Sequence, residues 1–238
     1  MSLYTLNAHD SLPRVTPRVE IQVEESVNIE LLSAMGSSPL SEIVIRLGND
    51  HSAYVATVDG VPAAFGWMAR GSAFIGELNH RLILPYRHRY LWNFRTLEPF
   101  RGLGIYPAML QRIINLERPN ADKFWIVHAP ENNASLRGIQ KAGFQYVGRL
   151  YNTGTQTTIE TTTLSSEYKE ILDEMDIKVA SYEPVSCWNC SSPFLKKRHS
   201  ACCCAVQSRP CVVNNLSELL ERPLRYIRRP VSPALPAW

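Results

Sequence analysis

The chain has 238 residues, of which 45% are hydrophobic and 20% are charged. This composition is ordinary for a globular protein with one large domain, or with a domain and an appendage. No stretch approaches the ~20 consecutive apolar residues of a membrane-spanning helix, and the N-terminus lacks the basic-then-apolar layout of a secretion signal. We therefore expect a cytoplasmic protein with no membrane partner.

The net charge of +3 conceals an uneven distribution. Residues 187–238 carry eight Lys and Arg against two Glu, together with all six cysteines, so the earlier part of the chain is slightly acidic. The chain therefore divides into parts of different composition. We expect a flexible N-terminal arm over residues 1–16, a folded domain over 17–163, a helical connector over 164–186 and a cysteine-rich basic extension over 187–238.

The first half of the folded domain reads as one strand, two helices and then a run of strands. The expected elements are a strand over 19–23, helices over 24–35 and 41–47, strands over 52–58 and 61–69, and a further hairpin within 71–84. Asp59-Gly60 lies between the second and third of these strands and is a strong hairpin signal.

The second half is predicted to contain the central strand of the sheet, which aromatic and leucine residues mark over 90–97. The expected elements that follow are a turn over 101–104, a helix that includes Pro107, a strand over 124–129, a helix over 135–142, a hairpin over 144–163, a helix from Ser165 and a short helix over 215–220. This order predicts an α+β fold with a mixed, mostly antiparallel central sheet flanked by helices, and a small cysteine-rich C-terminal extension.

The turn between the central strand and its helix is the first candidate site. Arg101 stands beside Gly102 and Gly104, and Pro107 is tolerated in the first helical turn. The first N–H groups of a helix have no partner within the helix and attract anions, so this turn is suited to a phosphate or pyrophosphate. The alternative is that the glycines and the proline only make a tight connection.

Two segments resemble the GNAT superfamily of acyl-CoA-dependent N-acetyltransferases. In EPFRGLGIYPAML (98–110), Arg101 and Gly104 match the family's Arg/Gln-x-x-Gly-x-Gly/Ala pattern, with Tyr106 in place of the last small residue. In ENNASLRGIQKAGFQYVGRL (131–150), Asn132, Lys141, Gly143 and Phe144 match a second family segment at the expected separation. The resemblance covers roughly residues 17–163 and implies a GNAT-like fold.

The resemblance implies transfer of an acetyl or other acyl group from acyl-CoA to a primary amine by direct attack. It places the pyrophosphate on the turn, polarisation of the thioester on backbone N–H groups near the end of the central strand, and the pantetheine arm beside Asn132. The implied cofactor-binding residues are Leu97, Arg101, Gly102, Leu103, Gly104, Ile105, Tyr106 and Asn132. For Asn132 the alternative is a structural Asx turn that opens a helix.

Proton transfer needs a base for the amine and an acid for the thiolate. Glu98 and Glu77 are the candidate bases, and for Glu77 the alternative is an ion pair with Arg81 or Arg89. Many family members place the acid, a tyrosine, where this chain has Ile139, which cannot donate a proton. The candidate replacements are Tyr106, Tyr146 and Tyr151, unless the thiolate leaves without help or catalysis is lost. His128 is expected to be a core or rim histidine rather than a base.

The cysteine-rich extension has the ligand types of a structural zinc site. Cys187-x-x-Cys190 provides one pair of thiolates, and His199 with Cys202 or Cys204 would complete a tetrahedron. Cytoplasmic thiols stay reduced, so we do not expect a disulfide framework. The alternatives to zinc are small buried cysteines or redox-active thiols. The extension is also a candidate for part of the acceptor site or for a homodimer interface.

We therefore predict a cytoplasmic N-acyltransferase that uses acetyl-CoA or another acyl-CoA and an amine acceptor, with structural zinc in the extension. One alternative is a non-catalytic acyl-CoA-binding or protein-interaction module, which would release no thiol with any amine. Another is a zinc-stabilised nucleic-acid adaptor on a GNAT-like core, which would bind oligonucleotides in a strongly salt-dependent way. The basic residues of the extension more often mark a solvated face than a nucleic-acid site.

Overall fold

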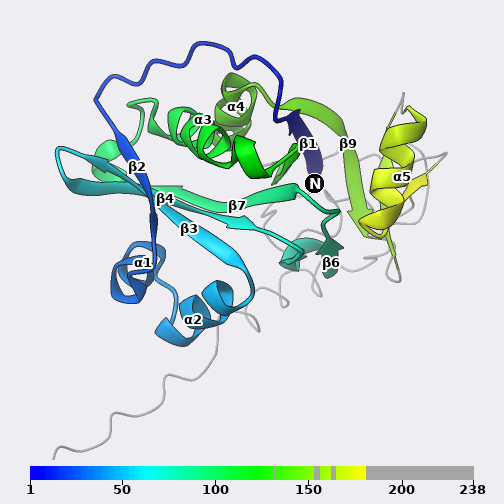
Figure 1. Ribbon diagram of the computed structural model, residues 1–238, viewed down its shortest axis with the longest axis horizontal. Coiled ribbons are helices and arrows are strands. Elements are labelled where there is room, and N and C mark those ends of the chain that lie inside the picture. The colour runs from blue at the N-terminus through cyan, green and yellow to red at the C-terminus, as the bar shows by residue number, and fades with distance from the viewer. Residues whose placement is uncertain (131, 153–155, 162–164, 181–238) are drawn as a thin grey trace, which may run out of the picture.

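The computed structural model describes residues 1–130, 132–152, 156–161 and 165–180 (Figure 1). The predicted zinc ligands, the short helix over 215–220 and the basic tail lie outside these residues. The described part is α+β, as predicted, with helices on both faces of one large sheet. None of its helices combines the length and the apolar character needed to cross a membrane.

The sheet has nine strands within the described residues. Their spatial order is β11 (Ile177–Ala180), β10 (Thr157–Glu160), β9 (Gln145–Asn152), β1 (Ser2–Asn7), β8 (Lys123–His128), β7 (His88–Thr96), β4 (Val61–Ala69), β3 (His51–Val58) and β2 (Gln22–Ser26). Neighbouring strands are antiparallel except for β7 with β8 and β10 with β11, which are parallel. The expected extra hairpin is present as a separate pair, β5 (Ser72–Ile75) and β6 (His80–Ile83).

The helices pack on the two faces through three hydrophobic clusters. They are α1 (Ile29–Gly36), α2 (Leu40–Gly48), α3 (Ile105–Glu117), α4 (Asn133–Ala142) and α5 (Ser166–Glu174). Figure 1 shows α3 and α4 on one side of the central strands and α1 and α2 on the other. The core under α3 includes Met109 and Ile113, whereas the core under α1 and α2 includes Leu32 and Trp67.

The prediction of a flexible arm over residues 1–16 is wrong for its first half. Residues 2–7 form β1, which lies between β8 and β9 and pairs Ser2 with both His128 and Arg149. Leu3 and Leu6 are buried on opposite faces of the strand, in two different core clusters. A strand whose partners lie more than a hundred residues away leaves no local pairing signal, which is why the sequence did not reveal it.

The sheet continues past residue 163, where the sequence predicted the folded domain to end. The helix predicted from Ser165 is α5, capped by the Ser165 side chain, but it is followed by β11, which pairs in parallel with β10. Leu172 and Ile177 are buried in the same cluster as Leu3. Residues 165–180 are therefore part of the same core rather than a separate connector.

Local signals located most of the other elements to within a few residues. The β3–β4 hairpin turns at Asp59 and Gly60, both with positive φ, as the dipeptide predicted. The first helix begins later than expected, because the side chain of Asn28 accepts a hydrogen bond from Leu31 N (2.9 Å) and caps it.

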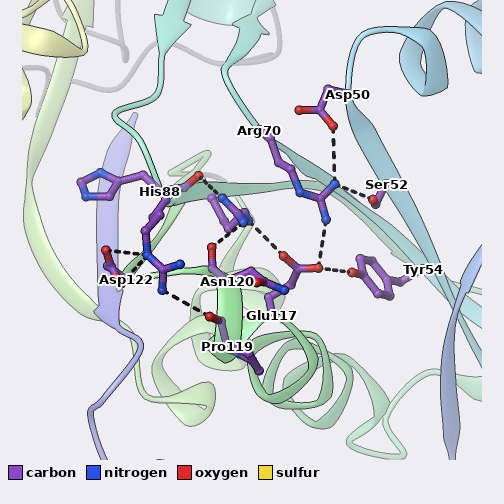
Figure 2. A network of polar contacts seen from close by, with 11 residues as sticks. Asp50, Ser52, Tyr54, Arg70, His88, Glu117, Pro119, Asn120 and Asp122 are labelled. Carbon is purple, nitrogen blue, oxygen red and sulfur yellow. Dashed lines mark hydrogen bonds and ion pairs between the residues drawn. The ribbon is translucent and has the colours of Figure 1, made fainter.

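A buried polar network closes the C-terminal end of α3 (Figure 2). The carboxylate of Glu117 accepts hydrogen bonds from the Tyr54 hydroxyl (2.9 Å), Arg70 Nη2 (3.0 Å) and Arg89 Nε (3.0 Å). These partners come from β3, from the loop after β4 and from β7, so one carboxylate links three segments of the sheet region to α3.

We predict that Glu117→Ala lowers the free energy of unfolding by about 3–5 kcal/mol, because it leaves the buried Arg89 without its counter-charge and removes one of the two carboxylates that pair with Arg70. Tyr54→Phe removes one hydrogen bond and should cost only about 1 kcal/mol. Urea unfolding of both variants measures the difference. A Glu117→Ala cost no larger than that of Tyr54→Phe would contradict the assignment of Glu117 as the centre of the network.

His88, at the start of β7, is buried and neutral. Its Nδ1 accepts a hydrogen bond from Trp125 Nε1 (3.2 Å), so the ring proton is on Nε2. Burial, with a smaller contribution from Lys123, lowers the pKa of His88 to about 4, and Arg89 acts in the same direction while Asp122 and Glu167 oppose it.

This pKa predicts a pH dependence of stability. The folded-state pKa lies below the ordinary value of ~6.5, so the unfolded chain takes up the proton first. The contribution of His88 is therefore complete above about pH 6.5 and is lost as the pH falls toward 4. His88→Asn keeps an acceptor for Trp125 but does not titrate, so its free energy of unfolding should fall less between pH 7.5 and 5 than that of the parent chain. Parallel curves for the two proteins would exclude His88 as the titrating group.

Candidate active site

The parallel pair β7–β8 separates partway along its length. The ladder joins His88–Leu91 of β7 to Lys123–Ile126 of β8, but β7 runs on to Thr96 and β8 to His128. Just beyond the last pair, Asn93 has a positive φ (51°) and the pairing of β7 with β4 is irregular. The edge of β7 that follows Leu91 is therefore free of β8 and can hydrogen-bond an extended ligand.

The N-terminus of α3 follows directly after this free edge. Its N-cap is Gly104, at a φ of 79°, and no side chain caps the helix. Gly102 has the same φ, and a methyl group there would meet nothing within 4 Å, so a ligand can approach the backbone closely. The N-terminus of a thirteen-residue helix with no side-chain cap and no acidic residue in its first turn fits a phosphate group.

Two contacts fix the turn against the rest of the domain. Arg101 is exposed, and its Nε donates to Thr96 O (3.3 Å) at the end of β7. On the other side, Arg18 N donates to Leu103 O (2.8 Å), and a methyl group at Gly104 would lie 3.3 Å from Pro17 Cα. The structure therefore brings the predicted residues Arg101–Tyr106 together with the end of β7.

The side chain of Tyr106, in the first turn of α3, lies against α4 and next to the free part of β7. Its ring packs against Phe94 (centroids 5.5 Å apart) and over Gly138, where a methyl group would lie only 2.3 Å from Tyr106 Cδ1. Its hydroxyl lies 3.5 Å from Ser135 Oγ. Burial raises the pKa of Tyr106 to about 12, so the phenol is protonated at neutral pH.

Asn132 caps α4, and the Asx alternative describes its local role. Its Oδ1 accepts from Ser135 N (3.0 Å), and its carbonyl oxygen lies 2.9 Å from His128 Nε2. His128 is accordingly a buried histidine bound to the backbone, as expected. Asn132 is exposed at the α4 N-terminus and stays a prediction as a cofactor contact.

The backbone N–H groups near Leu97 that are predicted to polarise a thioester do not include that of Leu97 itself. Leu97 N donates to Ala63 O (2.8 Å), and Leu97 O accepts from Phe100 N (3.0 Å). Both backbone groups are therefore already bonded within the protein, because Leu97 still pairs with the β4 side. Any N–H that polarises the thioester belongs to the edge of β7 that faces away from β4.

The two candidate bases lie in different places. Glu98 is exposed on the short 3-10 helix Glu98–Phe100, directly before Arg101. Glu77 is exposed in the turn between β5 and β6, and its charge contributes to the raised pKa of Tyr90, near the opposite end of β7 from Arg101. Arg89 pairs with Glu117 rather than with Glu77. Only Glu98 is next to the turn.

The other acid candidates are also separated by the fold. Ile139 is completely buried in the core under α3 and α4, as its apolar side chain requires. The Tyr151 hydroxyl donates to Glu160 Oε2 (2.8 Å) on the neighbouring strand β10, and Tyr146 is half exposed on β9 against Tyr4. Tyr106 is the candidate that packs directly against the free part of β7.

Sequence reasoning missed the close packing that places Tyr106. Gly66 lies within strand β4 and Gly138 within helix α4. A glycine inside a strand or a helix often marks the close approach of another group. A methyl group at Gly66 would lie 2.2 Å from the ring of Phe94.

The described residues contain no cluster of metal-ligating side chains, and the predicted zinc ligands lie beyond them.

No protein-family model and no curated protein sequence matches the chain. Solved structures with a similar arrangement include the aminoglycoside N-acetyltransferase AAC(6')-Iy in complex with a bisubstrate analogue (16% identity, 56% of this chain and 95% of that chain, TM-score 0.46). They also include GNAT-family acetyltransferases from Streptococcus pneumoniae (14%, 57% and 90%, TM-score 0.41) and Colwellia psychrerythraea (14%, 61% and 52%, TM-score 0.42).

Proposed function

We propose that this protein transfers an acetyl or other acyl group from acyl-CoA to a primary amine by direct attack. The observation that supports it best is the uncapped N-terminus of α3 immediately beside the free edge of β7. One element suits a pyrophosphate and the other suits an extended amide-containing arm, and acyl-CoA carries both groups in one molecule.

Binding would use mainly backbone groups. The N–H groups of residues 102–106 would hold the pyrophosphate, with the exposed Arg101 guanidinium beside them. The free edge of β7 would hydrogen-bond the pantetheine arm and polarise the thioester carbonyl, and Asn132 would contact the arm from α4. The bound acyl-CoA supplies the thioester, whose carbonyl carbon the amine attacks.

Proton transfer would fall to Glu98 and Tyr106. Glu98 is exposed beside the turn, where it can accept a proton from the acceptor ammonium directly or through water. Tyr106 keeps its proton at neutral pH because burial raises its pKa, and a protonated phenol can donate to a departing thiolate. In this role Tyr106 would replace the tyrosine that many family members have at the position of Ile139.

Ile139 favours a second candidate, a non-catalytic acyl-CoA-binding module. Binding of acetyl-CoA without release of thiol in the presence of any amine from a broad panel would identify the protein as such a module. Structural zinc in the extension remains a separate prediction, which the metal content of the purified full chain would test.

We predict that acetyl-CoA raises the free energy of unfolding by about 2.7 kcal/mol at a concentration 100 times its dissociation constant. Arg101→Glu should abolish this gain, because it places a negative charge beside the phosphates. Arg112→Glu is the matched control, since Arg112 is exposed on α3 two turns further along. Thermal unfolding with and without ligand measures all three proteins. No gain at millimolar acetyl-CoA, or an equal loss in both variants, would contradict the proposed binding site.

We further predict that Tyr106→Phe lowers kcat at least ~100-fold, the lower end of the effect of general acid catalysis, while the affinity for acetyl-CoA is unchanged. The phenylalanine ring keeps the packing against Phe94 and Gly138, so the change removes only the hydroxyl, with its proton and its 3.5 Å contact to Ser135 Oγ. Tyr146→Phe, on β9, serves as the control. Initial rates of thiol release and acetyl-CoA titrations separate the two effects, and an unchanged kcat would assign the acid elsewhere.

A further inference from the structure

A second polar cluster lies on the face of the sheet opposite α3. The Arg46 guanidinium, from α2, lies 4.7 Å from the ring centroid of Trp92 on β7 and 5.1 Å from that of Trp67 on β4. The two indoles are 6.1 Å apart, and the His51 ring of β3 lies 5.4 Å from Trp92, edge to face. Four elements therefore bring one cation and three aromatic rings together; we call these residues the Arg46 cluster.

The hydrogen-bonding groups of the Arg46 cluster are incompletely used. Arg46 Nη1, Trp67 Nε1 and Trp92 Nε1 are buried and have no hydrogen-bond partner within the part of the chain that the structure describes. A buried donor without an acceptor destabilises the folded protein, and one explanation for such a group is a bound species that accepts its hydrogen bond. Three of them around one cation call for an acceptor, and a negatively charged one fits best.

His51 contributes the opposite kind of group. Its Nε2 lies 2.9 Å from the Ser72 carbonyl oxygen, so Nε2 carries the proton and Nδ1 is an acceptor. His51 Nδ1 is also buried without a partner in the described residues. Burial lowers the pKa of His51, which keeps the ring neutral. The Arg46 cluster therefore offers three donors and one acceptor to a ligand.

The Arg46 cluster is adjacent to the proposed reaction centre. Trp92 is the first residue of β7 after the last pair with β8, at Leu91 and Ile126. Its side chain packs with the core under α1 and α2, whereas Leu91 packs with the core under α3. A ligand at the Arg46 cluster would therefore approach the free edge of β7 from the face opposite the phosphate-binding turn.

A carboxylate already occupies the solvent side of the Arg46 guanidinium. Glu42, one helical turn earlier in α2, accepts a hydrogen bond from Arg46 Nη2. The Glu42 side chain is 47% exposed, whereas that of Arg46 is 13% exposed. The Glu42 carboxylate is open to water and pairs within a single helix, so a ligand carboxylate can compete with it for the Arg46 guanidinium.

We propose that the Arg46 cluster binds the carboxylate of the acceptor, so that the acceptor class is a compound carrying both a carboxylate and an amine, such as an amino acid. The carboxylate would accept from Arg46 Nη1 and the indole N–H groups, and His51 Nδ1 would accept from an N–H of the ligand. The role as acceptor rests on the proposed acyl transfer, but binding itself does not require acyl-CoA. The opposite assignment, an aromatic cage for a cation, is disfavoured because Arg46 itself places a positive charge between the rings.

The test follows the indole N–H signals of the ¹⁵N-labelled full chain by NMR, without acyl-CoA. The probes are the amino acids and, as matched controls, their carboxamides, which lack the negative charge. Trp67→Phe and Trp92→Phe assign the two signals, and Trp125, whose N–H is bonded to His88, is the internal reference. We expect at least one amino acid, and not its amide, to shift the Trp67 and Trp92 signals in a saturable way.

Two variants with opposite expected effects complete the test. Arg46→Met keeps the side-chain length but removes the charge and should weaken binding at least tenfold, while Glu42→Gln removes the competing carboxylate and should strengthen it. Binding of amides or tetramethylammonium in preference to carboxylates, or no shift with any amino acid to 50 mM, would overturn the proposal. Carboxylate binding in a protein that does not bind acetyl-CoA would refute the proposed acyl transfer and leave the carboxylate site in place.

Discussion

The position of the candidate site depends on two aromatic rings that lie against two glycines. Phe94 of β7 packs over Gly66 of β4, and Tyr106 of α3 packs over Gly138 of α4, while the two rings contact each other. A methyl group at either glycine would overlap a ring, so both close contacts require glycine. These residues hold the first turn of α3 against the free part of β7, so the turn before α3 and the strand edge keep a fixed position relative to each other.

The same part of β7 divides the site between the two faces of the sheet. After Leu91, the strand contributes Phe94 to the core under α3 and Trp92 to the core under α1 and α2. The left-handed Asn93 lies between them and makes the irregularity that allows this change of alternation. One ligand can therefore reach the strand from the turn before α3 and a second from the Arg46 cluster, without competing for the same side chains.

The sequence predicted the parts of this arrangement that local chemistry determines. Asp59-Gly60 specifies its hairpin, and the glycines before α3 form the predicted turn, where both have a positive φ. The sequence does not reveal that the Leu97 N–H is bonded to Ala63 O, because that bond depends on the register of β7 and β4. Nor does it reveal that Trp67 and Trp92 lie beside Arg46. Pairing register and cross-sheet contacts arise from tertiary structure, and the residues involved carry no distinctive local pattern.

The unexpected strand β1 explains how β8 can leave β7 early. β8 pairs with β7 at only four positions, His88–Leu91 with Lys123–Ile126, but with β1 along its whole length, from Lys123 opposite Asn7 to His128 opposite Ser2. β1 therefore still pairs with the last two residues of β8, Val127 and His128, where β8 no longer pairs with β7. The segment that sequence reasoning assigned to a flexible arm is thus the one that supports the opening between β7 and β8, and with it the proposed binding site for the pantetheine arm.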